Sequence, residues 1–200
     1  TLVIFMTDNG QAGRSGKLNG KNQKMYTAGF KTGKGSAYEG GTHVPAFWRW
    51  KGMLGEGEDI NALTAHIDLY KTFCELAAAE IPKGIQKIDG RSLLPLLENP
   101  QADWPDRELF IHVGRWNKGE DPNESKFKKC AVRTPRWRFV DNKELYDISN
   151  DPFEAEDVAS KHPEVVERLR NSYESWWQET VLLMVNEDRP YASEHPQEVR

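Results

Sequence analysis

The chain has 200 residues, a net charge of −4 and an apolar content of 38%, which suits one large domain or one domain with a small appendage. A charged fraction of 29% beside this apolar content excludes a disordered chain. No apolar run approaches the roughly 20 residues needed to cross a bilayer, so we expect no membrane span, and we also expect no nucleic-acid partner.

The chain opens with an apolar run, residues 1 to 6, which is followed by Thr7, Asp8 and Asn9. Continuous apolar runs are typical of strands that are buried on both faces, as in parallel α/β sheets. Ligands of such sheets gather at the carboxyl ends of the strands, which is where Asp8 and Asn9 fall. Because the chain opens within a strand, we expect it to be a piece of a longer protein.

Residues 10 to 43 are rich in glycine, and we expect them to form a long, shaped loop of the kind that is usually functional or disordered. Between Asn9 and Tyr38 there is no acidic residue, and there are six basic ones: Arg14, Lys17, Lys21, Lys24, Lys31 and Lys34. A local basic field can concentrate an anionic ligand. For most of these lysines, however, a solvated basic loop is the simpler interpretation.

Lys34 is the exception, because it stands between two glycines in the stretch "GKGSAYEGGTHVP", residues 33 to 45. Its ammonium is a compact charge that suits a tetrahedral oxyanion, and the glycines allow the backbone to approach closely. Glu39 could pair with Lys34, with an arginine or with a backbone amide. The pattern favours an anion-binding loop over a flexible linker.

The next segments predict a strand over residues 44 to 50 and an amphipathic helix over about 66 to 79. Cys74 falls on the apolar stripe of that helix, so we expect a buried thiol. The stretch "DGRSLLPLL" predicts a turn that leads into a short helix capped by Ser92.

The second half of the chain follows another pattern. Four short strands separated by turn signals, "ELFIHV", "KKCAVRT", "RWRFVD" and "KELYDI", predict a small antiparallel sheet. A helix is expected from about 163 to 181, with Pro163 in its first turn. We expect Trp176 and Trp177 to pack in the core, and Cys130 to be a buried strand residue.

Asp8 and Asn9 pair a carboxylate with an amide oxygen at the end of the first strand. Hard cations such as calcium take oxygen ligands of this kind. The same Asp-Asn-Gly tripeptide is also a common turn signal, so on these residues alone a simple turn is the default.

In the order in which they occur, these segments resemble a known family. "TLVIFMTDNG" followed by "GKGSAYEGGTHVPAFWRWKG" is similar to the second half of a type I sulfatase of the alkaline phosphatase superfamily. "HIDLYKTFCELAAAEIP", "IDGRSLLPLL" and "RTPRWRFV…KELYDISNDPFEAEDVA" resemble the family's C-terminal segments. The resemblance implies the C-terminal part of an α/β sandwich in residues 1–105, a small antiparallel sheet with a packed helix in 106–185, and a peripheral tail in 186–200.

The resemblance also implies roles for single residues. Asp8 and Asn9 would be two of the calcium ligands, and Lys34 would contact the sulfate group. His112, Arg115 and Trp116 stand in "FIHVGRWNKG", where family members often line the substrate cleft, although for His112 and Trp116 a structural role is as strongly expected.

One part of the family's site is absent from this sequence. The nucleophile of the family is a formylglycine made from Cys or Ser in a Cys/Ser-x-Pro-x-Arg motif, which this chain does not contain. We therefore expect a C-terminal fragment that carries about half of a site and is inactive alone. Such a fragment could also self-associate through the face that the missing half would cover.

The expected function of the whole protein is hydrolysis of the sulfate ester of a small molecule or a glycan, with calcium and formylglycine, by an exported enzyme. One alternative is a phosphodiesterase or phosphonate hydrolase of the same superfamily, because a fold does not fix a function. Another is a glycan- or anion-binding module without catalysis.

Overall fold

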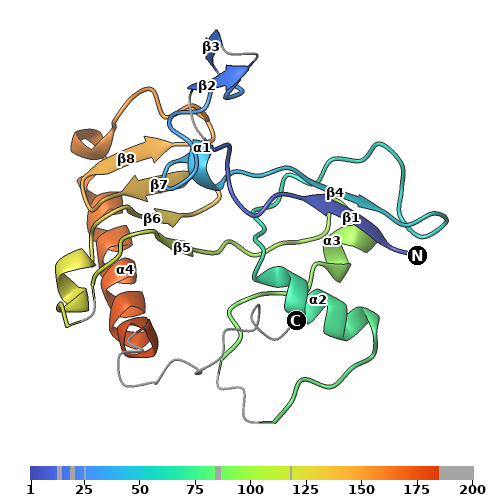
Figure 1. The fold of residues 1–200 in the computed structure, drawn as a ribbon. Coiled ribbons are helices and arrows are strands. Elements are labelled where there is room, and N and C mark those ends of the chain that lie inside the picture. Colours follow the sequence, from blue (N-terminus) through green and yellow to red (C-terminus); the bar gives the residue numbers. More distant parts are fainter. Residues whose placement is uncertain (13–14, 19–20, 25, 84–86, 118, 185–200) are drawn as a thin grey trace, which may run out of the picture.

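A computed structural model of the chain describes residues 1–12, 15–18, 21–24, 26–83, 87–117 and 119–184 (Figure 1). The strands are β1 (Val3–Met6), β2 (Ser15–Leu18), β3 (Lys21–Lys24), β4 (Ala46–Arg49), β5 (Leu109–His112), β6 (Cys130–Arg133), β7 (Trp137–Val140) and β8 (Glu144–Asp147). The α-helices are α1 (Glu39–Thr42), α2 (Asp68–Leu76), α3 (Leu94–Glu98) and α4 (Pro163–Met184), and the 3-10 helices are η1 (Pro122–Ser125) and η2 (Ala159–Lys161). The mixed helices and strands confirm the predicted α/β class.

The second half forms the predicted antiparallel sheet, in the order β5-β6-β7-β8. Its side chains alternate between two faces, as the period of a strand requires. On one face lie Val132 and Phe139, which are opposite each other in the register. On the other lie Ala131 and Val140, which form the neighbouring pair. Both faces are covered, each by a different segment of the chain.

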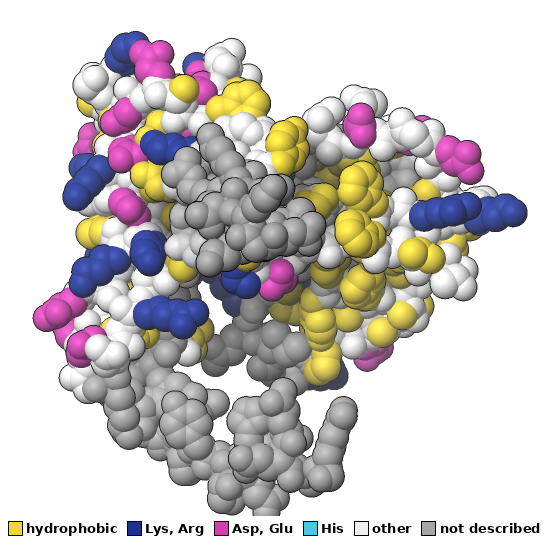
Figure 2. Space-filling model, turned by 45° about the horizontal axis from the view of Figure 1, so that its top comes forward, with side chains coloured by type: hydrophobic (Ala, Val, Ile, Leu, Met, Phe, Trp, Pro, Cys, Tyr) yellow, Lys and Arg dark blue, Asp and Glu magenta, His cyan; other side chains and the backbone are white. Residues whose placement is uncertain are grey.

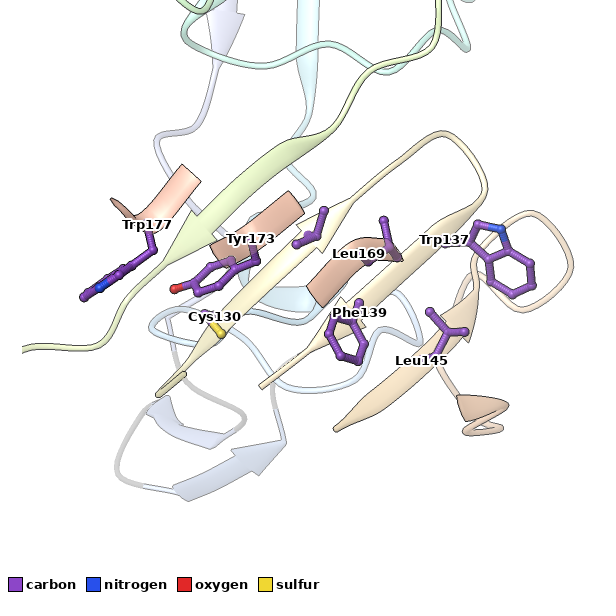
Figure 3. Packing of buried hydrophobic residues seen from close by; sticks show 8 residues of the cluster. Cys130, Trp137, Phe139, Leu145, Leu169, Tyr173 and Trp177 are labelled. Atoms are coloured by element: carbon purple, nitrogen blue, oxygen red, sulfur yellow. The ribbon is translucent and has the colours of Figure 1, made fainter. Parts of the chain in front are cut away.

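Helix α4 covers the first face and forms the larger core (Figure 3). Leu169, Tyr173 and Trp177 are spaced four residues apart, so they share one side of the helix, and all three are buried against the sheet. Trp176 packs beside them with its ring stacked on Phe110 at 5.2 Å. These contacts confirm the expected core role of both tryptophans, and Cys130 is buried among them as predicted.

The second face of the sheet is covered by the segment that leads into α1 (Figure 1). Ala37 is buried against the strands, and Tyr38 packs with it. The glycine-rich loop of the sequence analysis therefore runs across the C-terminal sheet. This placement connects the loop that carries Lys34 with the small antiparallel sheet.

The first half contains β1, which pairs with β4 in a two-stranded antiparallel sheet. The strand was predicted correctly, but the expected burial on both faces is not found. Trp48 packs toward Phe73 of α2 with ring centroids 6.3 Å apart. On the opposite face Phe5 and Phe47, which are cross-strand partners, are 62% and 66% exposed. Figure 2 shows hydrophobic side chains gathered on this half of the molecule.

Helix α2 is shorter than the expected helix over 66 to 79, and Cys74 is only half-buried, so the prediction of a buried thiol was wrong there. The apolar stripe that should cover it includes Ile67 and Tyr70, which are exposed. Ser92 lies one residue before the N-cap of α3, where its Oγ accepts a hydrogen bond from the Leu94 N–H at 3.3 Å.

Two further expectations concern the chain's less regular parts. The loop over residues 10 to 43 contains an unpredicted hairpin, β2–β3, in addition to α1. The tail over 186–200 lies outside the described residues, and the boundary near residue 105 stays a prediction. No helix in the described ranges is both long and apolar enough to cross a bilayer.

Candidate functional site

The end of β1 and the glycine-rich loop lie against each other. The Gly10 N–H donates to the Gly41 carbonyl at 2.9 Å, and the Lys34 N–H donates to the Gln11 carbonyl at 2.8 Å. Two backbone bonds thus join the residues that directly follow Asp8 and Asn9 to both ends of the Lys34–Gly41 segment. Asp8, Asn9 and Lys34 therefore lie in segments that are hydrogen-bonded to each other.

The contact is so close that it requires glycine. A Cβ atom at Gly10 would lie 2.0 Å from the Gly40 carbonyl oxygen, and one at Gly41 would lie 2.3 Å from the Ser36 carbonyl oxygen. Real Cβ atoms do not approach oxygen this closely, and both obstacles are backbone atoms that cannot rotate away. Gly10 is thus explained by the contact between the strand end and the loop, and Gly41 by close packing within the loop itself.

Lys34 is exposed, and in the described part of the chain its ammonium has neither a hydrogen bond nor an ion pair. Asp8 is also exposed, and Asn9 is half-buried. Polar groups that are held by their backbone and left without protein partners are available to a ligand. Lys34 is therefore free to contact an anion, and Asp8 and Asn9 are free to offer oxygen atoms to a ligand.

Lys31 contrasts with Lys34, because its charge is used within the protein. Its ammonium donates to the Tyr146 hydroxyl at 2.7 Å, lies 3.6 Å from Glu144, and lies over the Tyr38 ring at 4.6 Å. Among the other basic residues of the loop, Arg14 and the side chains of the lysines in β2 and β3 lie outside what the structure describes. Of the two basic side chains described in this loop, Lys31 is therefore paired within the protein and Lys34 is free.

Glu39, whose partner the sequence left open, pairs with two arginines of the sheet. It is 3% exposed, and its Oε1 accepts from Arg138 Nη2 at 2.6 Å and from Arg133 Nε at 2.8 Å. Burial alone would raise the pKa of this carboxyl group, but His43 and the two guanidinium groups outweigh it and hold the pKa well below its usual range. Glu39 is therefore an anion that anchors α1 to the sheet.

The residue types at the strand end fit a calcium ion in part. Asp8 and Asn9 offer carboxylate and amide oxygens, which calcium prefers, but calcium takes six to eight such ligands. Across the described ranges there is no group of three or more His, Cys, Asp or Glu residues that could hold a metal ion. One neighbour that sequence reasoning missed is His66, whose Nε2 lies 2.8 Å from the Thr7 carbonyl oxygen.

The other predicted substrate residues lie on the α4 side of the sheet. His112 Nε2 is 2.9 Å from the Ser125 carbonyl oxygen, and its ring lies 4.9 Å from that of Trp177. Trp116 packs against the same core, whereas Arg115 is exposed. These contacts give His112 and Trp116 a packing role. No contact between described residues joins the three to Lys34, and their place in a substrate cleft stays a prediction.

Comparisons with known proteins place this arrangement in a family. Residues 32–179 match the family described as N-sulphoglucosamine sulphohydrolase, C-terminal. Human steryl-sulfatase is 29% identical over 186 residues, covering 77% of this chain and 30% of its own. A sulfatase of Formosa agariphila is 27% identical over 197 residues, covering 88% of this chain and 32% of its own. The chain thus spans about a third of the length of these relatives.

Solved structures agree with the sequence matches. The crystal structure of Ps i-CgsB has a TM-score of 0.64 at 28% identity, over 88% of this chain and 36% of its own. A phosphonate monoester hydrolase of Agrobacterium radiobacter has a TM-score of 0.52 at 19% identity, over 98% of this chain and 38% of its own, which shows a shared fold only. The chain therefore belongs to the family of sulfatases that is defined by the C-terminal part of N-sulphoglucosamine sulphohydrolase.

Proposed function

We propose that the whole protein hydrolyses sulfate esters and that Lys34 contacts the sulfate group. The observation that carries the proposal is the exposed Lys34 ammonium, which has no partner among the described residues. The loop segment that contains Lys34 is also hydrogen-bonded to the residues that follow Asp8 and Asn9. Membership of a sulfatase family supports the reaction class.

Lys34 contributes fixed positive charge to the reaction. As a sulfate ester is cleaved, negative charge must be accommodated on oxygen atoms, and a preorganised cation stabilises it. The ammonium is a compact charge that can approach one sulfate oxygen closely. Because its backbone N–H is bonded to Gln11, the starting point of the flexible side chain is fixed.

Asp8 and Asn9 would hold part of the calcium site that the family resemblance implies. A bound calcium ion would supply Lewis-acid polarisation of the sulfate oxygens. The exposed Asp8 carboxylate would orient toward the ion, and the half-buried Asn9 would add a neutral oxygen. The formylglycine nucleophile would come from a part of the protein outside this sequence.

The substrate would be a sulfated small molecule or a sulfated glycan. Two of the similar proteins support this range: one is named a steryl-sulfatase, and the structure of BT4656 is a complex with its substrate D-Glucosamine-2-N, 6-O-disulfate. We further propose that the whole protein is exported, which remains to be tested by fractionation of the producing cells.

The second candidate is a phosphodiesterase or phosphonate hydrolase, because the Agrobacterium enzyme shares the fold and a fold does not fix a reaction. An assay of the whole protein on matched aryl esters of sulfate, phosphodiester and phosphonate decides between them. We expect turnover of the sulfate ester to exceed that of the other two. Preference for the phosphonate or phosphodiester, or binding of sulfated glycans without turnover, would contradict the proposed function.

A further inference from the structure

The inference starts from two arginines that face each other across the C-terminal sheet. Arg133 of β6 and Arg138 of β7 are cross-strand partners, and both lie on the face that meets α1. Like charges directly opposite each other destabilise a sheet. Arg138 is also buried, at 3% exposure, so its charge needs a partner that the sheet itself must find nearby.

That partner comes from the loop. The Oε1 atom of Glu39 accepts from Arg133 Nε at 2.8 Å and from both Nε and Nη2 of Arg138, at 2.9 and 2.6 Å. One carboxylate oxygen therefore bridges the two guanidinium groups. The other oxygen, Oε2, lies 2.9 Å from His43 Nδ1.

The main chain around Glu39 is held by Arg138 and by a further residue, Glu154. The Glu39 N–H donates to Glu154 Oε2 at 3.0 Å, and Arg138 donates to the Ala37 carbonyl and to Thr42 Oγ1. The sheet arginines and Glu154, which follows β8, thus hold α1 at the Glu39 side chain, at its first N–H and at residues on both sides of Glu39. Charge-assisted bonds of this kind fix geometry as well as adding energy.

Movement of α1 would be transmitted to the candidate site. Gly41 accepts the Gly10 N–H at 2.9 Å, and a Cβ atom at Gly40 would lie 2.4 Å from the Lys31 carbonyl oxygen. Carbonyl groups of the loop thus pack closely on the glycine pair, and Gly10 at the strand end packs closely on the Gly40 carbonyl. A shift of α1 therefore displaces the backbone on both sides of Lys34.

We propose that Glu39, held by Arg133 and Arg138, is a positioning residue that sets the place of Lys34 from the C-terminal sheet. Glu39 is buried, and its carboxylate is bonded to Arg133, Arg138 and His43, so it acts through the loop. The small antiparallel sheet then belongs to the functional machinery as its support. The effect on turnover rests on the proposed function, whereas the effect on the loop does not.

The test compares Glu39→Gln with Leu169→Ala in the whole protein. Leu169 packs on the opposite face of the same sheet, so its truncation destabilises the sheet without touching the loop. Amide exchange is followed by mass spectrometry in peptides covering residues 8–12 and 31–42. We expect exchange in both peptides to rise about tenfold or more in Glu39→Gln and to stay near wild type in Leu169→Ala. Unchanged exchange in Glu39→Gln would overturn the proposal.

Turnover of a sulfate ester supplies the second readout. A misplaced catalytic group lowers the rate, so kcat should fall roughly tenfold to a hundredfold in Glu39→Gln. In a Lys34→Ala background the same change should cost much less, because Glu39 acts through Lys34. Independent, multiplying effects, or raised exchange with normal kcat, would overturn the positioning role.

One further variant and one further outcome complete the test. Arg138→Lys keeps the charge but loses the forked geometry, and it should raise exchange in the same peptides if Glu39→Gln does not fold. Unchanged exchange in a folded Arg138→Lys protein would contradict the proposal. Absence of sulfate ester turnover in the wild-type protein would refute the proposed function, and the exchange data would still decide whether Glu39 holds the loop.

Discussion

Glu154 has a buried carboxyl group that is only partly hydrogen-bonded. Its side chain is 1% exposed, and its Oε1 has no hydrogen-bond partner among the described residues, although Arg138 Nε lies 3.7 Å away. Burial raises the pKa of this carboxyl group from 4.5 to about 7, more than the Arg138 charge lowers it. The nearby Glu39 carboxylate adds to the rise, and Lys31 opposes it.

The raised pKa predicts a pH-dependent stability. Between pH 4.5 and about 7 the folded protein retains a proton that the unfolded chain has lost, so stability falls as the pH rises through this window. The loss is on the order of 3 kcal/mol, since each unit of pKa difference contributes roughly 1.4 kcal/mol. Urea unfolding of Glu154→Gln at about pH 5 and about pH 8 should lack this part of the decline.

An exposed neighbour provides the control for this prediction. Glu156 has a side chain that is 65% exposed and pairs with Lys161 at the surface, so Glu156→Gln should keep the wild-type pH dependence. A Glu154→Gln variant with the same slope as wild type would contradict the raised pKa. The lowered pKa of Glu39 acts in the opposite direction and at lower pH, because its contribution is lost as the pH falls below 4.5.

Among the elements, α2 depends on a buried ion pair at its first residue. Asp68 is fully buried, and its carboxylate accepts from Arg107 Nη1 at 2.8 and 2.9 Å and from the N–H groups of Ala65 and Arg91. Four bonds from three chain segments thus converge on one side chain. The pair ties α2 to the segments before α3 and β5.

Removal of this carboxylate should lower the stability of the first half of the molecule. Asp68→Asn leaves the Arg107 charge buried without an anion and turns an amide N–H₂ group toward backbone donors. We expect a loss of about 3–5 kcal/mol in the free energy of unfolding, measured by urea denaturation. The exposed Asp89→Asn, which loses only a surface pair with Lys87, should change it by less than about 1 kcal/mol. Equal effects of the two variants would rule out the special role of Asp68.

The C-terminal elements could be predicted because their sequences carry local signals. Short strand-like runs separated by turn signals predict β6 to β8, and the four-residue spacing of Leu169, Tyr173 and Trp177 predicts the buried side of α4. The environment of β1 could not be predicted in the same way. Its apolar run indicates burial, but Phe5 and Phe47 are exposed in this chain, and we expect the rest of the whole protein to cover them.

The sequence predicted which residues belong to the candidate site, but not the contacts that hold them in place. The sequence placed Asp8, Asn9 and Lys34 together through the family resemblance, and the backbone bonds join their segments. The partners of Glu39 lie 94 and 99 residues away in the sequence, so no local pattern identifies them. Long-range charge pairing of this kind appears only in the folded chain.

At the scale of the whole molecule, we propose that the chain carries the sulfate-binding side of a site, and its described residues hold no group of three or more His, Cys, Asp or Glu that could bind a metal ion. Asp8 contributes one negative charge, and the loop beside it is basic. A basic field favours an anion over a bare cation. Self-association of this chain through the exposed face of β1 and β4 stays a prediction that sedimentation can check.

The incomplete site predicts weak metal binding by the chain alone. Asp8 and Asn9 supply only a few of the six to eight oxygens that calcium takes. Calorimetric titration of the purified chain with calcium should therefore show no affinity in the micromolar range, and a sulfate ester assay should show no turnover. Micromolar affinity or measurable turnover would mean that these 200 residues contain a complete site.

The central claim, that Lys34 meets the sulfate group, is tested most directly by kcat of the whole protein with Lys34→Ala on an aryl sulfate. Lys34 is exposed and makes no side-chain contact with other described residues, so its truncation should leave the unfolding transition unchanged. We expect kcat to fall roughly a hundredfold or more, because one preorganised charge is lost from the transition state. Turnover near that of the wild-type enzyme would contradict the account.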